Sequence, residues 1–320
     1  MPPRQVPRSS LARLQQALVL GSLAFAVAWV FFWWHRSPTI AVIGALLVLG
    51  GYALVLGLEG VAAAQLNRGD AAPPAGWSGL VGAWWQEVRV APQVFAWRQP
   101  FFWASLPDDA EPRESAVPAV VFVHGFVCNR GLWLPWMRRL RSQNVPYVSV
   151  NLEPVFGDID GYIPLMSDAV RRAQALTGLA PVLVCHSMGG LVARAWRAAE
   201  PDTPVHRIIT IGSPHRGTWL GRFSRVANGR QMRQDGGWLG ALARREAQLQ
   251  PKDTYADFVC WYSNADNIVF PASTATLPGA DNRLVPGAAH VALAFHPRVM
   301  DESLAIVASA AKSPSERTAL

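Results

Sequence analysis

The chain has 320 residues, of which 51% are hydrophobic and 16% are charged, and its formal net charge is +7. Soluble domains average about a quarter charged residues, so this composition predicts an apolar segment in addition to a globular domain. The basic residues form no long run, which favours a solvated surface over a nucleic-acid partner. Cys128, Cys185 and Cys260 are too few and too widely spaced for a disulfide framework or a zinc site.

Two uncharged apolar segments, residues 17–34 and 39–58, lie near the N-terminus on either side of a short polar turn. Each is close to the ~20 residues that a helix needs to cross a ~30 Å hydrocarbon core. A secretory signal peptide would instead have an apolar region of about 7 to 15 residues and no second segment so soon after it. We therefore predict a two-helix membrane hairpin in residues 1–60, and the alternatives are a cleaved signal peptide and a buried helical pair.

The basic residues around these segments predict an orientation. Arg4, Arg8 and Arg13 precede the first apolar segment, and no acidic residue does. The positive-inside rule then places the N-terminus in the cytoplasm, and a hairpin returns the chain to the same side. Arg36, in the turn, opposes this orientation because it lies on the far side.

Residues 61–117 are expected to connect the hairpin to the rest of the chain. Residues 72–76 are rich in alanine, proline and glycine and are typical of a linker. Residues 77–90 have the pattern of a short helix, and residues 94–103 have the composition of a β-strand.

Apolar strands alternate with helices from residue 118 onwards. Strands are expected at 119–126, 146–152, 180–187, 205–213, 258–269 and 282–285. The intervening segments have helical spacing, and Gly178 is placed to end one of these helices. This alternation predicts an α/β domain over 118–312, with a mostly parallel sheet flanked by helices on both faces. Residues 313–320 are expected to be a tail.

The clearest functional signal is Ser187, which lies between an apolar strand and a helix that begins at once. A serine hydroxyl is a weak nucleophile, and a sharp strand-to-helix turn with small neighbours exposes it beside a base. The usual pattern at such a turn is G-x-S-x-G, and here Cys185 replaces the first glycine. Because cysteine is small, the tight turn remains possible, and we predict Ser187 as a nucleophile.

The chain resembles bacterial lipases of the α/β-hydrolase superfamily over residues 118–308. The segments that carry this resemblance are VFVHGF, VCHSMGG, TIGSPHRGT, YSNADNIV and VPGAAHVAL. The last two are similar to loops of small Bacillus-type lipases, and the third is similar to a segment of larger triacylglycerol lipases. The resemblance implies a Ser187, Asp266 and His290 triad, with the backbone N–H groups of Phe126 and Met188 as the oxyanion hole.

The order of residues along the chain favours the same acid and base. In this fold the acid and then the histidine follow the serine. Asp266 comes just after an apolar strand, and His290 follows a turn of small residues. Asp257 and Asp281 are competing acids, and His296 is a competing base. His124 precedes the serine at a strand end and is expected to be structural.

Residues 214–250 separate two of the predicted strands and mix tryptophan and leucine with arginine. An insertion of this length in a compact domain is often functional, which predicts a cap or lid over an apolar ester. The alternative is a packed helical insertion that does not gate the site.

Together these features predict a serine-dependent carboxylic ester hydrolase, of lipase or esterase type, that acts through an acyl-enzyme on acyl esters or lipids. Alternatives are an acyltransferase or thioesterase with the same triad, and a catalytically silent membrane scaffold. We expect no cofactor, no metal and no nucleic-acid partner. The predicted location is a bacterial inner membrane, with two spans and a cytoplasmic catalytic domain.

Overall fold

A computed structural model describes residues 9–249 and 254–310 of the chain, so the predicted tail at 313–320 lies outside the described residues. Its centre is a six-stranded parallel sheet with the strand order β2-β1-β3-β4-β5-β6. The strands are β1 (Val120–Val123), β2 (Tyr147–Ser149), β3 (Val182–His186), β4 (Arg207–Ile211), β5 (Phe258–Tyr262) and β6 (Asp281–Leu284). All six predicted strands and the parallel sheet are confirmed.

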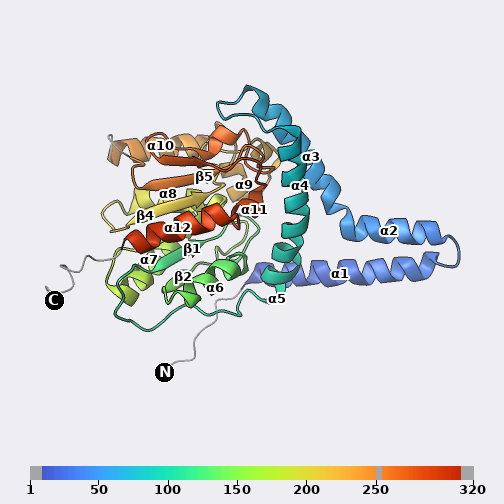
Figure 1. Cartoon of the computed structure of the whole chain (residues 1–320), viewed down its shortest axis with the longest axis horizontal. Coiled ribbons are helices and arrows are strands. Elements are labelled where there is room, and N and C mark those ends of the chain that lie inside the picture. Colours follow the sequence, from blue (N-terminus) through green and yellow to red (C-terminus); the bar gives the residue numbers. More distant parts are fainter. Residues whose placement is uncertain (1–8, 250–253, 311–320) are drawn as a thin grey trace.

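Helices cover both faces of this sheet (Figure 1). On one face lie α7 (Ile163–Thr177), α8 (Met188–Ala199) and α10 (Gly237–Leu249), and on the other lie α6 (Leu134–Ser142) and α12 (Pro297–Ser309). Successive side chains of a strand point to opposite faces. In β3, accordingly, Leu183 and Cys185 join the first core and Val182 and Val184 join the second. Strands buried on both faces explain the continuous apolar runs in the sequence.

The end of α7 confirms the helix boundary predicted at Gly178. This residue has a φ of 69°, and its N–H donates a hydrogen bond to the Gln174 carbonyl at 2.7 Å. Glycine adopts this left-handed conformation without the steric penalty that a Cβ brings.

Gly178→Ala is expected to lower the free energy of unfolding by about 1 kcal/mol. A Cβ at this position would meet no atom within 4 Å, so the cost is purely conformational. Gly161→Ala is the control, because Gly161 has no positive φ and its Cβ would make only an ordinary contact with Asp158. Urea denaturation of the two variants measures the difference.

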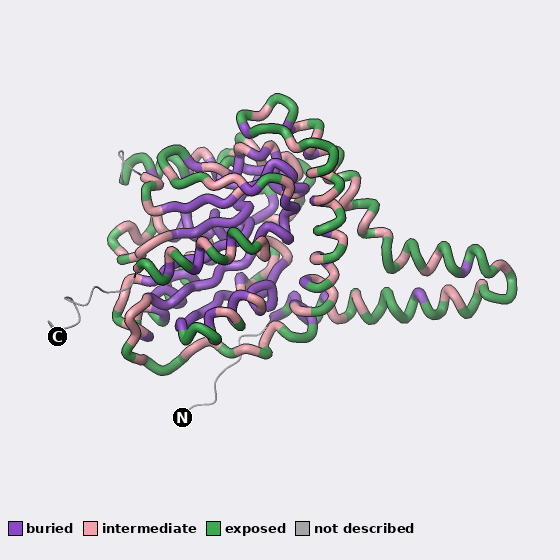
Figure 2. The backbone as a smooth tube through the Cα atoms, viewed as in Figure 1, coloured by how far each residue is buried: buried purple, intermediate pink, exposed green. Residues whose placement is uncertain are grey.

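The first half of the hairpin is a single long helix, α1 (Ser10–Trp33), and α2 (Pro38–Gly50) runs back beside it. The N-terminal turns of α1 dock on the globular body, and the rest projects from it together with α2 (Figure 1). Figure 2 shows the projecting parts as mostly exposed and the strands as buried. Within the described residues, α1 is the one helix that by itself has the length and apolar character to cross a membrane.

The second predicted apolar segment, residues 39–58, is not one straight helix. It is divided into α2 and α3 (Tyr52–Leu66), which meet at a bend of 54° and reach a membrane-spanning length only when taken together. The break falls at Gly50 and Gly51, where two adjacent glycines weaken the helix.

The connector is helical along most of its length. The predicted helix at 77–90 is confirmed as α4 (Trp77–Pro92), which packs against α3. The strand predicted at 94–103 is wrong: this segment forms a π-helical turn, η2 (Gln93–Arg98), followed by α5 (Gln99–Phe101). Its valine and aromatic residues fit any half-buried surface, and here Val94 and Phe95 pack into the core beside α6 instead of pairing with a strand.

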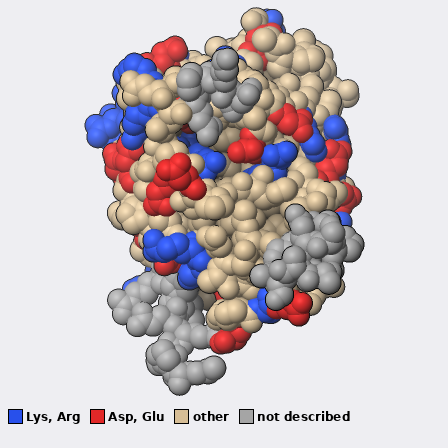
Figure 3. Space-filling model, turned by 90° about the vertical axis from the view of Figure 1, so that its left-hand side faces the viewer, with Lys and Arg blue, Asp and Glu red and all other residues tan. Residues whose placement is uncertain are grey.

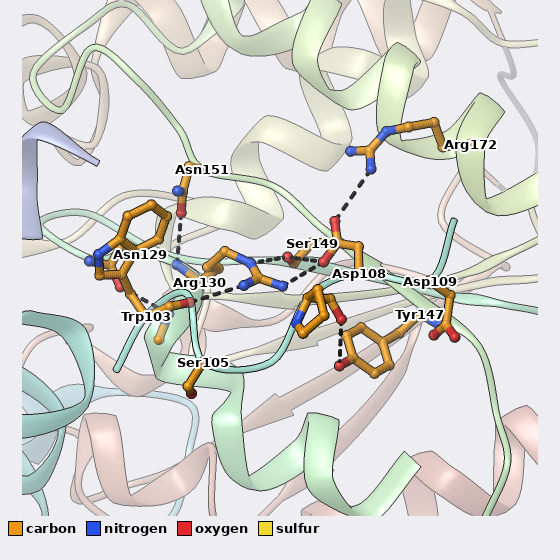
Figure 4. Close-up of polar contacts among 12 residues, drawn as sticks. Trp103, Ser105, Asp108, Asp109, Asn129, Arg130, Tyr147, Ser149, Asn151 and Arg172 are labelled. Carbon is orange, nitrogen blue, oxygen red and sulfur yellow. Dashed lines mark hydrogen bonds and ion pairs between the residues drawn. The ribbon is translucent and has the colours of Figure 1, made fainter. Parts of the chain in front are cut away.

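A buried arginine fastens the end of the connector to the sheet (Figure 4). Arg130 donates hydrogen bonds to Asp108 at 2.6 Å, to Ser149 at 2.6 Å and to the Trp103 carbonyl at 3.0 Å. Asp108 also accepts from the Ser149 N–H and from Arg172 on α7. The connector is therefore attached to β2 through a paired buried charge, and not through a strand pairing.

Charges of both signs are interspersed on the face that points away from the hairpin (Figure 3). The same mixture is found elsewhere at the surface of the globular domain, where Arg172 pairs with Asp168 and Arg283 pairs with Asp281. This distribution is that of a solvated surface, in contrast to the apolar surface of α1 and α2.

Candidate active site

Ser187 lies at the turn between β3 and α8, at the edge of the sheet where the strands end. Its φ of 54° and ψ of −128° are strained for a residue with a side chain. The side chain is buried, with an exposed fraction of 7%, and it lines a cavity. Cys185, where a glycine is usual, is fully buried within β3, so the small thiol fits inside the sheet.

Two glycines let the neighbouring backbone approach this turn. A Cβ on Gly189 would lie 2.5 Å from the Val123 carbonyl oxygen, and a Cβ on Gly125 would lie 2.7 Å from the Ser187 Cβ. Neither distance is compatible with a side chain, so both positions require glycine. The turn is thus built by β1 and β3 together.

Asp266 and His290 are brought together beside this serine. Asp266 follows β5, and its Oδ2 lies 2.9 Å from the His290 Nδ1. The other carboxylate oxygen accepts hydrogen bonds from the N–H groups of Ile268 and Val269, both at 2.8 Å. A carboxylate held in this way orients the imidazole with its proton on Nδ1, which leaves Nε2 free to accept a proton.

The charged groups around His290 raise its pKa. Burial by itself lowers the pKa of His290, but the charge and hydrogen bond of Asp266, helped by Glu87 and Glu59, raise it above its ordinary value. Burial and the nearby His290 hold the pKa of His186 well below its ordinary value. His186 is therefore neutral, although its ring lies 4.7 Å from that of His290.

Ser187 and His290 line the same cavity, but no hydrogen bond joins their side chains in the described structure. Such contacts are often long without substrate and tighten when substrate is bound. The backbone of each residue is held in place, because the Ser187 N–H donates to the Ile211 carbonyl and the His290 N–H donates to the Asn267 side chain.

The two predicted oxyanion donors flank the serine. Met188 is the first residue of α8, and Phe126 lies in the loop after β1. Neither backbone N–H donates a hydrogen bond within residues 9–249 and 254–310. The next loop residue, Val127, has a φ of 52°, which is rare for a β-branched side chain. Strain of this kind is common where a backbone is shaped for binding.

His124 holds the loop after β1 in place, as a structural residue would. Its Nδ1 lies 2.9 Å from the Gly125 carbonyl, and its Nε2 accepts from the Leu152 N–H at 3.0 Å. Burial lowers the pKa of His124 to about 4, so it stays neutral at physiological pH.

The alternative acids and the alternative base are placed away from Ser187 and make other contacts. Asp257 pairs with Arg207 at 3.2 Å, and Asp281 pairs with Arg283 at 2.6 Å. His296 is at the start of α12 and does not line the cavity. In the part of the chain that the structure describes, no cluster of three or more His, Cys, Asp or Glu side chains could hold a metal ion.

Two acidic residues of the N-terminal helices contact the loops that carry Asp266 and His290, and neither was predicted from the sequence. Glu87 on α4 accepts hydrogen bonds from the N–H groups of Val291 and Ala292, at 3.0 and 3.1 Å. Glu59 on α3 accepts one from the Asn267 side chain at 2.9 Å. A sequence signal exists, since Glu59, Asp70 and Glu87 are the only acidic residues among the first 107.

A cavity of about 660 Å³ opens beside Ser187. Its lining comes from the turn at the serine, from the loops that contain Phe126, Asn267 and His290, and from the N-terminal helices α1 to α4 with η2. Residues 214–249, the described part of the predicted lid, contribute no lining residue.

The C-terminal part of the predicted lid, α10, packs against α8. The guanidinium of Arg194 on α8 makes a buried two-point contact with Glu246 on α10, at 2.6 and 2.9 Å, and donates to the His215 carbonyl. Trp238 donates to Asp160. These contacts favour the alternative of a packed helical insertion, and the N-terminal helices occupy the place at the cavity where the lid was expected.

Comparisons with known proteins agree with this fold. Among curated proteins there is no match. The mature lipase BlEst2 of Bacillus licheniformis is 17% identical, with a TM-score of 0.53 over 62% of this chain and 96% of that one. Lipase B of Aspergillus fumigatus is 16% identical, with a TM-score of 0.56 over 97% of this chain and 84% of that one. Residues 120–303, more than half of the chain, match the Alpha/beta hydrolase family, and the chain belongs to that family.

Proposed function

We propose that this protein is a serine carboxylic ester hydrolase that acts through an acyl-enzyme on acyl esters. The observation that carries the proposal is the buried Asp266–His290 pair beside the strained Ser187, at the end of a mostly apolar cavity. A serine, an oriented histidine and a buried carboxylate are the groups that nucleophilic acyl transfer needs. Membership of the alpha/beta hydrolase family is consistent with it.

The proposed reaction has two steps. Ser187 Oγ attacks the ester carbonyl carbon while its proton passes to His290 Nε2, and the N–H groups of Phe126 and Met188 bind the oxyanion. The intermediate collapses, and the alcohol leaves with the proton from His290. Water then attacks the acyl-serine, gives its proton to His290, and releases the carboxylic acid as the proton returns to Ser187.

The proposed location is a membrane. The apolar surface of α1 and α2 would be costly in water, and α1 is long enough to cross a bilayer. In this proposal the α1–α2 hairpin anchors the chain, the bent α2–α3 pair forms the second span, and the hydrolase domain lies in the cytoplasm. A protease-protection assay on vesicles of known orientation tests the last point.

Ser187→Ala is expected to reduce release of p-nitrophenol from butyrate and palmitate esters to the background rate, because the substitution removes the hydroxyl that forms the proposed acyl-enzyme. Thermal unfolding of the variant is the control for folding. Labelling of the wild-type serine by a fluorophosphonate is the second readout. If folded wild type in detergent cleaves neither ester and takes no label, the hydrolase proposal is wrong and a silent scaffold replaces it.

Acyl transfer and thioester hydrolysis use the same residues and differ only in the acceptor or leaving group. Adding an alcohol to the p-nitrophenyl assay separates acyl transfer from hydrolysis. A transferase would form the new ester faster than the free acid, whereas a hydrolase would not.

A further inference from the structure

Part of the cavity wall lies outside the stretch that matches the hydrolase family. Val19 on α1, Leu49 on α2, and Tyr52, Val55 and Leu56 on α3 all line the cavity that contains Ser187 and His290. The family match begins only at residue 120. The helices that carry the predicted membrane anchor are therefore also a wall of the candidate active site.

We propose that these helices form the binding site for the acyl chain of a membrane lipid ester, which enters from the bilayer between α1 and α3. This inference rests on the proposed ester hydrolase function and names its substrate class. The anchor is then part of the substrate site as well as a tether.

The polarity of the lining supports an amphiphilic substrate. The polar groups gather near the serine, where Glu59, Glu87 and Asn267 contact one another or the histidine loop. The walls that α1, α2 and η2 form consist mainly of aliphatic and aromatic side chains, such as Val19 and Phe95. A lipid ester has the same division, with a polar carbonyl at one end and a long apolar chain at the other.

The volume fits this substrate. Binding sites for small molecules measure about 300 to 1,000 Å³, and this cavity of about 660 Å³ lies within that range. It begins at the serine and extends to α1, so a chain bound with its carbonyl at Ser187 Oγ would run towards the hairpin.

The mouth of the cavity is apolar as well. Val55 and Leu49 line it, yet they are 55% and 48% exposed, so they stand where the cavity meets the surroundings. The surface continues onto the exposed Leu46 and Leu54 of the same two helices. An apolar opening that is continuous with an apolar outer surface favours access from lipid over access from water.

Two tryptophan substitutions, one on α1 and one on α3, are expected to narrow the cavity from two sides. Val19→Trp and Leu56→Trp are made in the full-length chain, reconstituted in phosphatidylcholine vesicles, and kcat/KM is measured for p-nitrophenyl butyrate and palmitate. The expected result is a fall of about tenfold or more in the palmitate-to-butyrate ratio, because the indole occupies space that a long chain needs. Leu56→Ala cannot clash, and it is expected to move the preference towards longer chains.

The matched controls are Leu20→Trp on α1 and Leu58→Trp on α3. Both side chains are exposed, at 56% and 72%, and neither lines the cavity. Their ratios should stay within about twofold of wild type. Titration of Ser187 with a short-chain fluorophosphonate corrects every rate for the fraction of folded enzyme.

Two negative results have different meanings. If wild type cleaves both esters but the cavity variants keep the wild-type ratio, the acyl chain lies elsewhere and the inference is wrong, although the hydrolase proposal stands. If wild type cleaves neither ester and is not labelled, the hydrolase proposal itself fails, and the acyl site fails with it.

Discussion

Asp266→Asn is expected to lower kcat for p-nitrophenyl butyrate by about 10⁴-fold while leaving the fold intact. The substituted side chain can still accept the hydrogen bonds from Ile268 and Val269 through its remaining oxygen. Its amide nitrogen, however, would face His290 Nδ1 and donate to it. That contact favours the imidazole tautomer with the proton on Nε2, which cannot accept the Ser187 proton.

The matched control is Asp257→Asn. Asp257 is a half-exposed acid that pairs with Arg207 on the surface, so its removal should leave kcat within about twofold of wild type. Initial rates give kcat, and thermal unfolding checks the fold of each variant. Equal losses in the two variants, or no loss in Asp266→Asn, would show that Asp266 does not orient the base.

Local signals in the sequence were sufficient to predict the sheet and the turn at Ser187. Strands buried on both faces leave continuous apolar runs, as in β3, and Gly178 marks the end of α7 because the left-handed conformation requires it there. The strand, serine and helix at the turn are adjacent in the chain, so their geometry follows from a few residues. The pairing of Asp266 with His290 was predicted from their order in the chain.

The remaining parts of the site depend on contacts between residues far apart in the chain. Glu87 meets Val291 across 204 residues, and Glu59 meets Asn267 across 208. No local pattern indicates such a partner. For the same reason the sequence predicted a lid at 214–250, where Glu246 instead pairs with Arg194 of α8, and did not predict that α1 and α3 line the cavity.

Glu87→Gln is expected to move the acid limb of the kcat/KM profile for p-nitrophenyl butyrate to lower pH. Desolvation in its buried position raises the pKa of Glu87 to about 7. Asp266 makes the largest contribution to the raised pKa of His290, and the charges of Glu87 and Glu59 add to it. A neutral glutamine removes the contribution of Glu87, so the pKa of His290 falls and the base stays unprotonated at lower pH.

The same substitution changes how stability depends on pH. Because the pKa of Glu87 is raised from 4.5 to about 7 on folding, its contribution is fully present below about pH 4.5. The contribution decreases as pH rises and is lost above about pH 7, with a total change of up to about 3 kcal/mol. Glutamine does not titrate, so the variant should gain this amount relative to wild type between pH 4.5 and pH 8.

Urea denaturation of both proteins at intervals across this range measures the difference, and Glu111→Gln is the control, because Glu111 is exposed. A purely structural role for Glu87, through its hydrogen bonds to Val291 and Ala292, predicts a loss of stability that is the same at every pH and an unmoved acid limb. A shift in both profiles would instead show that a carboxyl group on α4, outside the family match, sets the protonation of the base. The N-terminal helices would then control the chemistry of the site through charge as well as through its shape.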